Sequence, residues 1–297
     1  MNWSRVEQRI GTNRFQRLQQ AKVGIVGLGS GGGFVALNLA KSGVRHFTLV
    51  DDDVMEVGNV VRHVCDLRSV GQLKVTAVSA LIAQRNPEAV VKTYPKRIQD
   101  CWQALAELDL LIVGVDGERT KFEVNAVCLE RKLTAIYAGV YERGEGGDVV
   151  WIRAGEGPCY ACWAAQLRED IAELPEGPAL DYGLSIEEQD LRAEPGLWLD
   201  VVRVAAAQTH FALAVLSEPD DGEPNLRGNT LLIANRDLEF FPGVTTPAQS
   251  SHWIQIDRQE DCLVCGAVSA SAAEDEPPVS LQELTATSPF DRQDSEQ

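Results

Sequence analysis

The sequence predicts an α/β fold, a Rossmann-like and mainly parallel sheet with helices on both faces, and three observations predict it. Short apolar runs alternate along the chain with longer segments of helical periodicity. A glycine cluster separates the first strand-like run, Val23–Val26, from the helix-like Phe34–Ala40. Two Cys-x-x-Cys pairs, one in the middle of the chain and one near residue 264, predict a shared metal site that ties the C-terminal part to the middle.

Composition and charge limit the classes of function. The 297 residues can bury a substantial core, and 44% hydrophobic with 24% charged residues is ordinary for a soluble globular protein. A net charge of −17 disfavours nucleic acid as a partner and fits a basic protein partner or simple solubility. No apolar run approaches the roughly 18 residues of a membrane span, and the N-terminus does not resemble a signal peptide. Seven cysteines in such a chain predict a cytoplasmic location, where pairs of cysteines more often bind metal than form disulfides.

The glycine cluster predicts a phosphate-binding turn. Gly27, Gly29 and Gly32 fit the pattern G-x-G-x-x-G between a strand and a helix, where glycines let backbone N–H groups approach a phosphate. The next strand, Phe47–Val50, ends in the acidic run Asp51–Asp53, where an acid can bind a ribose hydroxyl. An ordinary strand–helix–strand unit with a glycine-rich turn is the alternative. Because strand, turn, helix and acid stand in register, we expect a ligand with a ribose and phosphates.

Polar residues further along can complete such a site. Asn59 and Arg62 follow the acidic run, and Lys74 opens the next predicted helix. Arginine offers a planar fork and lysine a compact charge to phosphates, although each residue taken alone is more often a surface residue. The buried strand Leu108–Asp116 presents Asp116 at its carboxyl end, where doubly wound sheets bind ligands. Asp116 is therefore a candidate Mg²⁺ ligand.

The remaining periodicity completes the alternation of strands and helices. We expect further strands at Val90–Tyr94, Thr134–Val140, Val149–Ile152 and Leu231–Ala234, with helices at Val75–Gln84, Cys101–Glu107, Lys121–Arg131 and Gly196–Leu216. Gly144, Gly146 and Gly147 predict a turn before the third of these strands. Residues 1–22 contain four arginines in a polar segment, which predicts a solvated helix face.

Two segments lie outside this pattern. Residues 166–196 carry acidic patches, prolines such as Pro175 and Pro178, and no cysteine, which predicts a loop or mobile crossover. Residues 267–297 are rich in Ser, Ala, Pro and acids, which predicts a disordered acidic tail. The sequence therefore predicts one domain over residues 1–266 that includes the crossover, followed by the tail.

The two cysteine pairs supply the ligands of a metal site. Four thiolates match the number and ligand type of a closed tetrahedral Zn²⁺ site, formed here by Cys159, Cys162, Cys262 and Cys265. With all four positions held by protein, no position remains for an activated water, so a structural role is favoured. A redox pair is the alternative, but two matched pairs favour zinc.

Together, the glycine turn, the D-x-D strand end, N-x-x-R, the following lysine, the strand-end aspartate and the two Cys-x-x-Cys pairs resemble one family. They are similar to the ThiF/MoeB/HesA adenylyltransferases, the catalytic core shared with ubiquitin-activating enzymes. The resemblance covers about residues 5–266. Each motif is weak alone, but the ordered set is specific.

The resemblance implies a chemistry and a set of partners. It implies binding of ATP and Mg²⁺ and activation of the C-terminal carboxylate of a ubiquitin-like or sulfur-carrier protein that ends in glycine, with formation of an acyl-adenylate and pyrophosphate. It also implies a homodimer. The N-x-x-R-H form and the long crossover are more similar to conjugation-operon members, which favours a bacterial ubiquitin-like conjugation pathway with a conjugating enzyme or a JAB-type protease as a further partner.

The same resemblance implies residue roles. By match to the family motifs, the phosphate turn would be lined by Gly27, Gly29 and Gly32. The D-x-D residues Asp51 and Asp53 would lie at the nucleotide, with Asp51 on the ribose. The phosphates would be contacted by Asn59, Arg62 and Lys74, and Mg²⁺ would be bound by Asp116. The segment Asn2–Arg5 loosely resembles the family's R-Y-x-R, whose last arginine reaches the ATP of the partner subunit, so Arg5 joins Arg62, Lys74 and Asp116 as a candidate catalytic residue.

Two departures from the family pattern limit what the resemblance implies. Gly117 stands where the family often has an asparagine, and the 166–196 crossover lacks the cysteine that thioester-forming members use. Of the unassigned cysteines, Cys101 and Cys128 fall in predicted helices and are expected to be core residues, whereas Cys65 lies in the loop near the expected ATP site. His63 is expected to be structural, because a carboxylate nucleophile is already ionised at pH 7 and needs no base.

Three other functions remain open. The chain can instead adenylate the carboxylate of a small molecule, a peptide or a tRNA, although the acidic charge weighs against tRNA. It can be a catalytically silent scaffold that binds a ubiquitin-like protein, against which the retained Arg62, Lys74 and Asp116 argue. A dinucleotide dehydrogenase would have no place for the cysteine pairs or for N-x-x-R followed by lysine.

Overall fold

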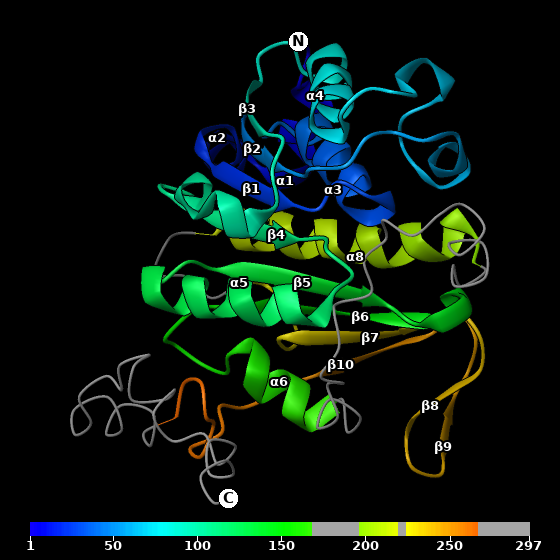
Figure 1. The fold of residues 1–297 in the computed structure, drawn as a ribbon. Helices are drawn as coiled ribbons and strands as arrows, with labels where there is room; N and C mark the ends of the chain where they lie inside the picture. Colours follow the sequence, from blue (N-terminus) through cyan, green and yellow to red (C-terminus); the bar gives the residue numbers. More distant parts are fainter. Residues whose placement is uncertain (168–195, 219–223, 267–297) are drawn as a thin grey trace, which may run out of the picture.

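The computed structural model describes residues 1–167, 196–218 and 224–266, and its centre is one eight-stranded sheet (Figure 1). In chain order its strands are β1 (Lys22–Val26), β2 (His46–Val50), β3 (Val90–Tyr94), β4 (Leu110–Val113), β5 (Ala135–Val140), β6 (Gly146–Ile152), β7 (Thr230–Ala234) and β10 (Ser251–Ile254). Their order across the sheet is β10-β7-β6-β5-β4-β1-β2-β3. A separate hairpin consists of β8 (Leu238–Phe241) and β9 (Val244–Thr246).

The sheet has a parallel half and an antiparallel half. Strands β3, β2, β1, β4 and β5 pair in parallel with one another. Strands β6, β7 and β10 extend the sheet in antiparallel pairings. Parallel neighbours need long crossover connections, whereas antiparallel neighbours need only a short turn, and β5 and β6 are joined by five residues. The predicted α/β class with a mainly parallel sheet is confirmed, and the parallel half carries the glycine turn.

Helices cover both faces of this sheet, as predicted (Figure 1). Leu110 and Ile112 of β4 belong to the core under one layer of helices, whereas Leu111 and Val113 belong to the core under the other. This alternation follows from the two-residue period of a strand. The first layer contains α2 (Thr12–Gln20), α3 (Ser30–Lys41), α4 (Lys74–Arg85) and α8 (Trp198–Ser217), the second contains α5 (Glu118–Arg131) and α6 (Tyr160–Leu167), and α1 (Ser4–Ile10) precedes α2.

Helix α8 is the predicted late helix, and by length and composition alone it is apolar enough to cross a membrane. In this fold it is a core helix. Val204 and Phe211 are buried against the sheet, and the buried Gln208 side chain donates to the carbonyl oxygens of Val113 (3.1 Å) and Ile136 (3.0 Å). These hydrogen bonds hold α8 against β4 and β5.

Two local predictions were wrong. Gly144 lies in the connection between β5 and β6, as predicted, but Gly146 and Gly147 lie inside β6. A Cβ on Gly146 would lie 2.5 Å from the Ile233 oxygen, and one on Gly147 2.5 Å from the Gly139 oxygen. Close approach of neighbouring backbones, and not a turn, requires these two glycines. The predicted helix at Cys101–Glu107 is instead a short 3₁₀ segment, Trp102–Leu105. The other 3₁₀ segments are Val57–Arg62, Leu67–Ser69, Ile98–Asp100 and Glu142–Gly144.

Two other predictions fall largely or wholly outside the described residues. They are the crossover at 166–196, of which only residues 166, 167 and 196 are described, and the acidic tail at 267–297.

Candidate functional site

The carboxyl ends of β1, β2 and β4 meet at one edge of the sheet, which we call the glycine corner. Gly27 directly follows β1 and donates its N–H to the Val50 oxygen of β2 (2.9 Å). Gly114 directly follows β4 and donates to the Val26 oxygen of β1 (2.8 Å). The chain order reverses at β1, which has β2 on one side and β4 on the other. Ligands of open α/β sheets bind at such a reversal.

The fold requires glycine at two of the predicted positions, Gly27 and Gly32, but leaves room for a side chain at Gly29. Gly27 has a φ of +83°, and a Cβ there would lie 2.7 Å from the Gly114 oxygen. A Cβ on Gly32 would lie 1.9 Å from the Gly27 oxygen. Gly29 has nothing within 4 Å of an added Cβ and precedes α3 without a side-chain cap. The start of α3 thus has no side-chain cap, and the space beside Gly29 is open, which favours an anionic ligand there.

This difference between Gly29 and Gly32 gives a paired prediction. Gly32→Ala should lower the free energy of unfolding by more than about 3 kcal/mol, because a backbone oxygen cannot move aside for the methyl group. Gly29→Ala should unfold at the wild-type temperature yet bind ATP more weakly, because its methyl group occupies the space in front of α3. Thermal unfolding and equilibrium dialysis with ATP measure the two effects. The exposed Gly58→Ala, which also has nothing within 4 Å, serves as the control for both. Wild-type ATP affinity in Gly29→Ala would show that the phosphates do not lie at this turn.

Asp51 shapes the turn. Its carboxylate accepts the Leu28 N–H at 2.6 Å and the Asp53 N–H at 2.9 Å, which joins the loops after β1 and β2. Burial raises the pKa of Asp51, and the Leu28 hydrogen bond and the nearby Lys74 charge act in the opposite direction. Each carboxylate oxygen retains a second acceptor position, to which a ribose hydroxyl can donate.

Lys74 is a largely buried cation beside the corner. It is the first residue of α4, and its side chain is 11% exposed. Its Nζ donates to the Asp53 carboxylate at 2.6 Å, and its backbone N–H donates to the Asp53 oxygen at 2.9 Å. After burial, the Lys74 charge is among the causes that shift the pKa values of both Asp51 and His63. Lys74 therefore lies close to the turn, with two further N–H donors on its ammonium group.

His63 fixes the loop after β2 against the glycine turn. The Cys65 N–H donates to His63 Nδ1 at 3.0 Å, so the proton of the ring lies on Nε2. His63 Nε2, 2.7 Å from the Leu28 oxygen, donates to it. Burial lowers the pKa of His63, and the Lys74 charge lowers it further. The expectation that His63 is structural agrees with this geometry, since both ring nitrogens are already used.

The lowered pKa of His63 predicts a pH dependence of stability. The unfolded chain takes up a proton near pH 6.5, whereas the folded chain resists it because His63 is buried and because its Nδ1 would also have to stop accepting the Cys65 N–H. The neutral, buried His63 therefore contributes fully to the free energy of unfolding above pH 6.5, and this contribution is lost as the pH falls below 6.5. Between pH 7 and 5 the unfolding free energy of the unmodified protein should fall more steeply than that of His63→Gln, by up to about 1.4 kcal/mol per pH unit. Denaturant titrations measure it, with the exposed His210→Gln as control; equal slopes in all three proteins would contradict it.

The remaining predicted residues differ in how they are engaged. The half-buried Asn59 side chain accepts the Glu56 N–H at 3.0 Å and so caps the Val57–Arg62 segment. Arg62, next to His63, is exposed, and its side chain has no hydrogen bond or ion pair with the described residues. Asp116 is likewise exposed and unpaired there, three residues beyond β4.

Arg5 lies outside the elements that form the corner. It is exposed in α1, and its side chain has no hydrogen bond or ion pair with the described part of the chain. Its predicted role concerns a second subunit, so its place in one subunit leaves that role a prediction.

One set of contacts near Asp116 has no counterpart in the sequence analysis. Glu118, the first residue of α5, accepts from the Lys121 ammonium group (2.9 Å) and from the Tyr160 hydroxyl of α6 (2.9 Å). The Tyr160 N–H in turn donates to the Asn125 side chain at 2.9 Å. These contacts connect the start of α5, next to the loop that carries Asp116, to α6, which contains Cys162 of the cysteine cluster. A pairing over 42 positions leaves no periodic signal in the sequence.

The four predicted metal ligands come together. The Sγ distances are 3.9 Å for Cys159–Cys162, 3.7 Å for Cys159–Cys262 and 3.4 Å for Cys162–Cys265, and all four atoms lie within 4.8 Å of one another. Zn–S bonds of about 2.3 Å at tetrahedral angles place sulfurs about 3.8 Å apart, whereas a disulfide needs about 2.0 Å. The four residues therefore fit a closed tetrahedral metal site.

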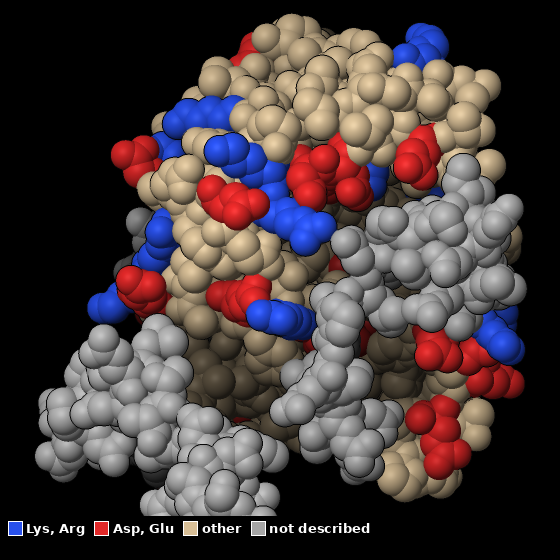
Figure 2. Space-filling model, viewed as in Figure 1, with Lys and Arg blue, Asp and Glu red and all other residues tan. Residues whose placement is uncertain are grey.

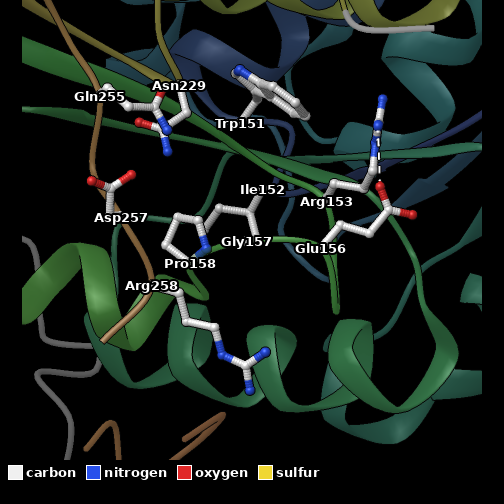
Figure 3. Close-up of a pocket in the computed structure, with 10 residues that line it drawn as sticks. All are labelled: Trp151, Ile152, Arg153, Glu156, Gly157, Pro158, Asn229, Gln255, Asp257 and Arg258. Carbon is white, nitrogen blue, oxygen red and sulfur yellow. Dashed lines mark hydrogen bonds and ion pairs between the residues drawn. The ribbon is translucent and has the colours of Figure 1, made fainter. Parts of the chain in front are cut away.

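A cavity of about 290 Å³ lies at the other edge of the sheet (Figure 3). Ile152 in its wall pairs with Ala135 at the amino end of β5, so the cavity is remote from the glycine corner. Its wall mixes both signs of charge and includes the Arg153–Glu156 ion pair at 3.2 Å, which favours no single class of ligand. It is lined by Trp151, Ile152, Arg153, Glu156, Gly157, Pro158, Asn229, Gln255, Asp257 and Arg258.

Charges on the visible face are mixed as well. Figure 2 shows Lys and Arg side chains next to Asp and Glu side chains over the coloured part of that face. Nucleic acid binding needs a continuous basic surface, which this part of the face does not present.

Comparison with known proteins identifies the family. A model of the ThiF family matches residues 4–265. The chain belongs to the ThiF family. The resemblance predicted from the ordered motifs is thus confirmed.

Curated relatives match this ThiF-family chain over about half of its length. Ubiquitin-like modifier-activating enzyme 5 of Drosophila mojavensis is 28% identical over 162 residues, which are 50% of this chain and 41% of that protein. Adenylyltransferase and sulfurtransferase UBA4 of Lodderomyces elongisporus is 29% identical over 160 residues, which are 53% of this chain and 35% of that protein. The chain thus spans about two fifths of the length of the curated relatives it matches.

Solved structures confirm the fold over more of the chain. MccB of E. coli superposes with a TM-score of 0.67 at 22% identity, covering 90% of this chain and 72% of that one. PaaA superposes with a TM-score of 0.61 at 17% identity, covering 86% and 74%. At these identities the likeness shows the α/β fold alone.

Proposed function

We propose that this ThiF-family chain uses ATP to adenylate the C-terminal carboxylate of a ubiquitin-like or sulfur-carrier protein. The observation that carries the proposal is the buried Lys74 ammonium group beside a glycine turn whose Gly29 faces open space. The names of the relatives, a ubiquitin-like modifier-activating enzyme and an adenylyltransferase and sulfurtransferase, support the same chemistry. The N-x-x-R-H sequence supports a bacterial conjugation pathway as its setting.

The reaction makes modest demands on the side chains. A carboxylate oxygen attacks the α-phosphorus, the bond from that phosphorus to the bridging oxygen breaks, and pyrophosphate leaves with the electron pair. The nucleophile is already ionised at pH 7, so no general base is needed. Neutral His63, hydrogen-bonded at both nitrogens, agrees with this. The site must instead offset charge on the phosphates and align the reactants.

The chain's own residues can meet those demands. We assign phosphate binding to the turn with Gly27, Gly29 and Gly32, and ribose binding to Asp51. Lys74, which Asp53 holds in place, and Arg62 would offset the phosphate charge, and Asn59 would lie beside them. Asp116 would hold Mg²⁺, because its carboxylate is exposed and unpaired among the described residues. Bound Mg²⁺ would neutralise further phosphate charge.

Three further assignments belong to the proposal. The cysteine cluster would hold a structural Zn²⁺, because its sulfur spacing fits tetrahedral coordination. The protein would be a cytoplasmic homodimer in which Arg5 reaches the nucleotide of the partner subunit. Sedimentation velocity tests the dimer, and recovery of exchange on mixing Arg5→Ala with Lys74→Ala subunits tests the shared site.

Exchange of labelled pyrophosphate into ATP tests the proposed function. Exchange should depend on a ubiquitin-like protein ending in glycine, and it should be lost in Asp116→Ala and Arg62→Ala. Arg119→Ala is the matched control, because Arg119 is 76% exposed and pairs with Glu123 on the surface of α5. Its rate should equal the wild-type rate.

The alternatives give different outcomes in the same assay. Exchange with a free peptide, a small acid or a tRNA, and not with a protein, would favour the second enzyme class. Tight binding of a ubiquitin-like protein without any exchange would favour a silent scaffold. Binding of NAD at the glycine corner in place of ATP would overturn the proposal.

A further inference from the structure

All seven cysteines of the chain lie within the described residues, so the fate of every thiol is known. Four of them form the cysteine cluster described above, where the proposed Zn²⁺ would occupy their thiols. The other three are Cys65, Cys101 and Cys128, with exposed fractions of 3%, 0% and 2%. At most three thiols of this chain could therefore carry an acyl group as a thioester.

Each candidate is packed into the core. Cys65 belongs to the core under α3 and α4, and Cys101 and Cys128 belong to the core under α5 and α6. The Cys101 thiol donates to the Arg97 oxygen at 3.2 Å. Burial raises the pKa of Cys65 to about 11 and that of Cys128 to about 12. Attack on an activated carbonyl needs an accessible thiolate, and these thiols are neither accessible nor ionised.

Cys65 is the candidate nearest to the glycine corner, since its N–H donates to His63. That contact places its backbone, not its thiol, toward the corner. Its side chain is buried in the core under α3 and α4, the apolar cluster that also contains Val35 and Val75. To reach an acyl group at the corner, the Cys65 thiol would have to leave this core.

We infer that the acyl-adenylate formed at the glycine corner is consumed by a nucleophile from a second molecule, without a thioester on this chain. The inference rests on the proposed function. In the step, a thiol or a primary amine of the second molecule attacks the acyl carbonyl carbon. The bond from that carbon to the AMP oxygen breaks, AMP leaves with the electron pair, and the nucleophile gives its proton to solvent. The product is a thioester or an amide on the second molecule, and nothing is oxidised or reduced.

The test uses the full-length, metal-loaded chain with ATP and an acceptor protein that supports pyrophosphate exchange. After acid quench without reductant, intact mass spectrometry should find no acceptor attached to this chain. Added cysteamine, which carries both a thiol and an amine, should capture the acyl group in solution. Cys65→Ala should capture it within twofold of the wild-type rate, with Cys101→Ala and Cys128→Ala as matched buried controls. A reductant-sensitive adduct on the chain that disappears in one of these variants would overturn the inference.

A second measurement does not depend on the acceptor. Iodoacetamide added to the folded chain, with and without ATP, should leave Cys65, Cys101 and Cys128 unlabelled until urea is added. Rapid labelling of one of them in the presence of ATP would show that a nucleotide-bound state exposes it and would overturn the inference. Absence of exchange with every acceptor would count against the proposed function, while the labelling result would still report on the thiols.

Discussion

Lys74→Ala should reduce ATP–pyrophosphate exchange by about 10²-fold or more while the protein remains folded. The Lys74 side chain is 11% exposed, so its charge is poorly screened by water and acts strongly on a phosphate at the corner. Its partner Asp53 is 64% exposed, so removing the lysine leaves that carboxylate in water, and the half-buried Asp51 keeps its two backbone hydrogen bonds. The effect should therefore appear in the exchange rate and not in the unfolding temperature.

Two matched variants sharpen this prediction. Asp53→Asn keeps the ammonium group but weakens the contact that positions it, so we expect a smaller loss of exchange than in Lys74→Ala. The double variant should lose no more than Lys74→Ala alone, because the two residues act through one contact. Lys92→Ala removes an exposed lysine of β3 and should leave exchange unchanged. Exchange near the wild-type rate in Lys74→Ala would remove this residue from the proposed mechanism.

Removing the metal should cause the largest loss of stability. The cysteine cluster joins residues 103 positions apart, so an occupied site closes a long loop and holds the unfolded chain in fewer conformations. A covalent link across about 100 residues is worth about 5 kcal/mol by the same argument. We expect a chelator to lower the unfolding temperature by about 10–20 °C, at 2–4 °C for each kcal/mol. Differential scanning fluorimetry with metal analysis of the purified chain measures both the shift and the zinc content.

Cys265→Ser provides the control for chelation. Cys265 is the least buried of the four ligands, so its replacement removes a ligand with little disturbance of the core. The variant should unfold at the temperature of the chelated wild-type protein, and the chelator should have no further effect on it. A metal-free purified chain with a Cys159–Cys162 disulfide would instead favour the redox alternative.

Sequence alone predicted the parts of the molecule that depend on local patterns. The glycine turn, the acidic run after β2 and the strand that precedes Asp116 each follow from a few adjacent residues with one conformational preference. The cysteine cluster was predictable although its halves lie far apart, because two identical short pairs can satisfy one tetrahedral ion together. The mainly parallel order followed from alternating strands and helices.

The remaining features depend on contacts between distant segments. The hairpin of β8 and β9 and the edge strand β10 are short; β8 and β9 pair with each other and β10 pairs with β7, so these strands depend on tertiary contacts more than on a local pattern. Gly146 and Gly147 look like turn residues in sequence, yet the neighbouring strands are what exclude a side chain there. The Glu118–Tyr160 bond and the burial of Lys74 likewise appear only when α5, α6 and the loop after β2 are placed.

The spacing of the cysteine cluster has a consequence for how the molecule is made. A ribosome that has synthesised residue 141 has already supplied every strand of the parallel half, but Cys262 and Cys265 emerge more than a hundred codons later. Until then the nascent polypeptide contains only the first cysteine pair of the cluster, Cys159 and Cys162. The proposed metal could therefore be bound by all four thiols only after residue 265 has been synthesised, and a premature stop codon before position 262 would yield the residues of the corner without the second cysteine pair.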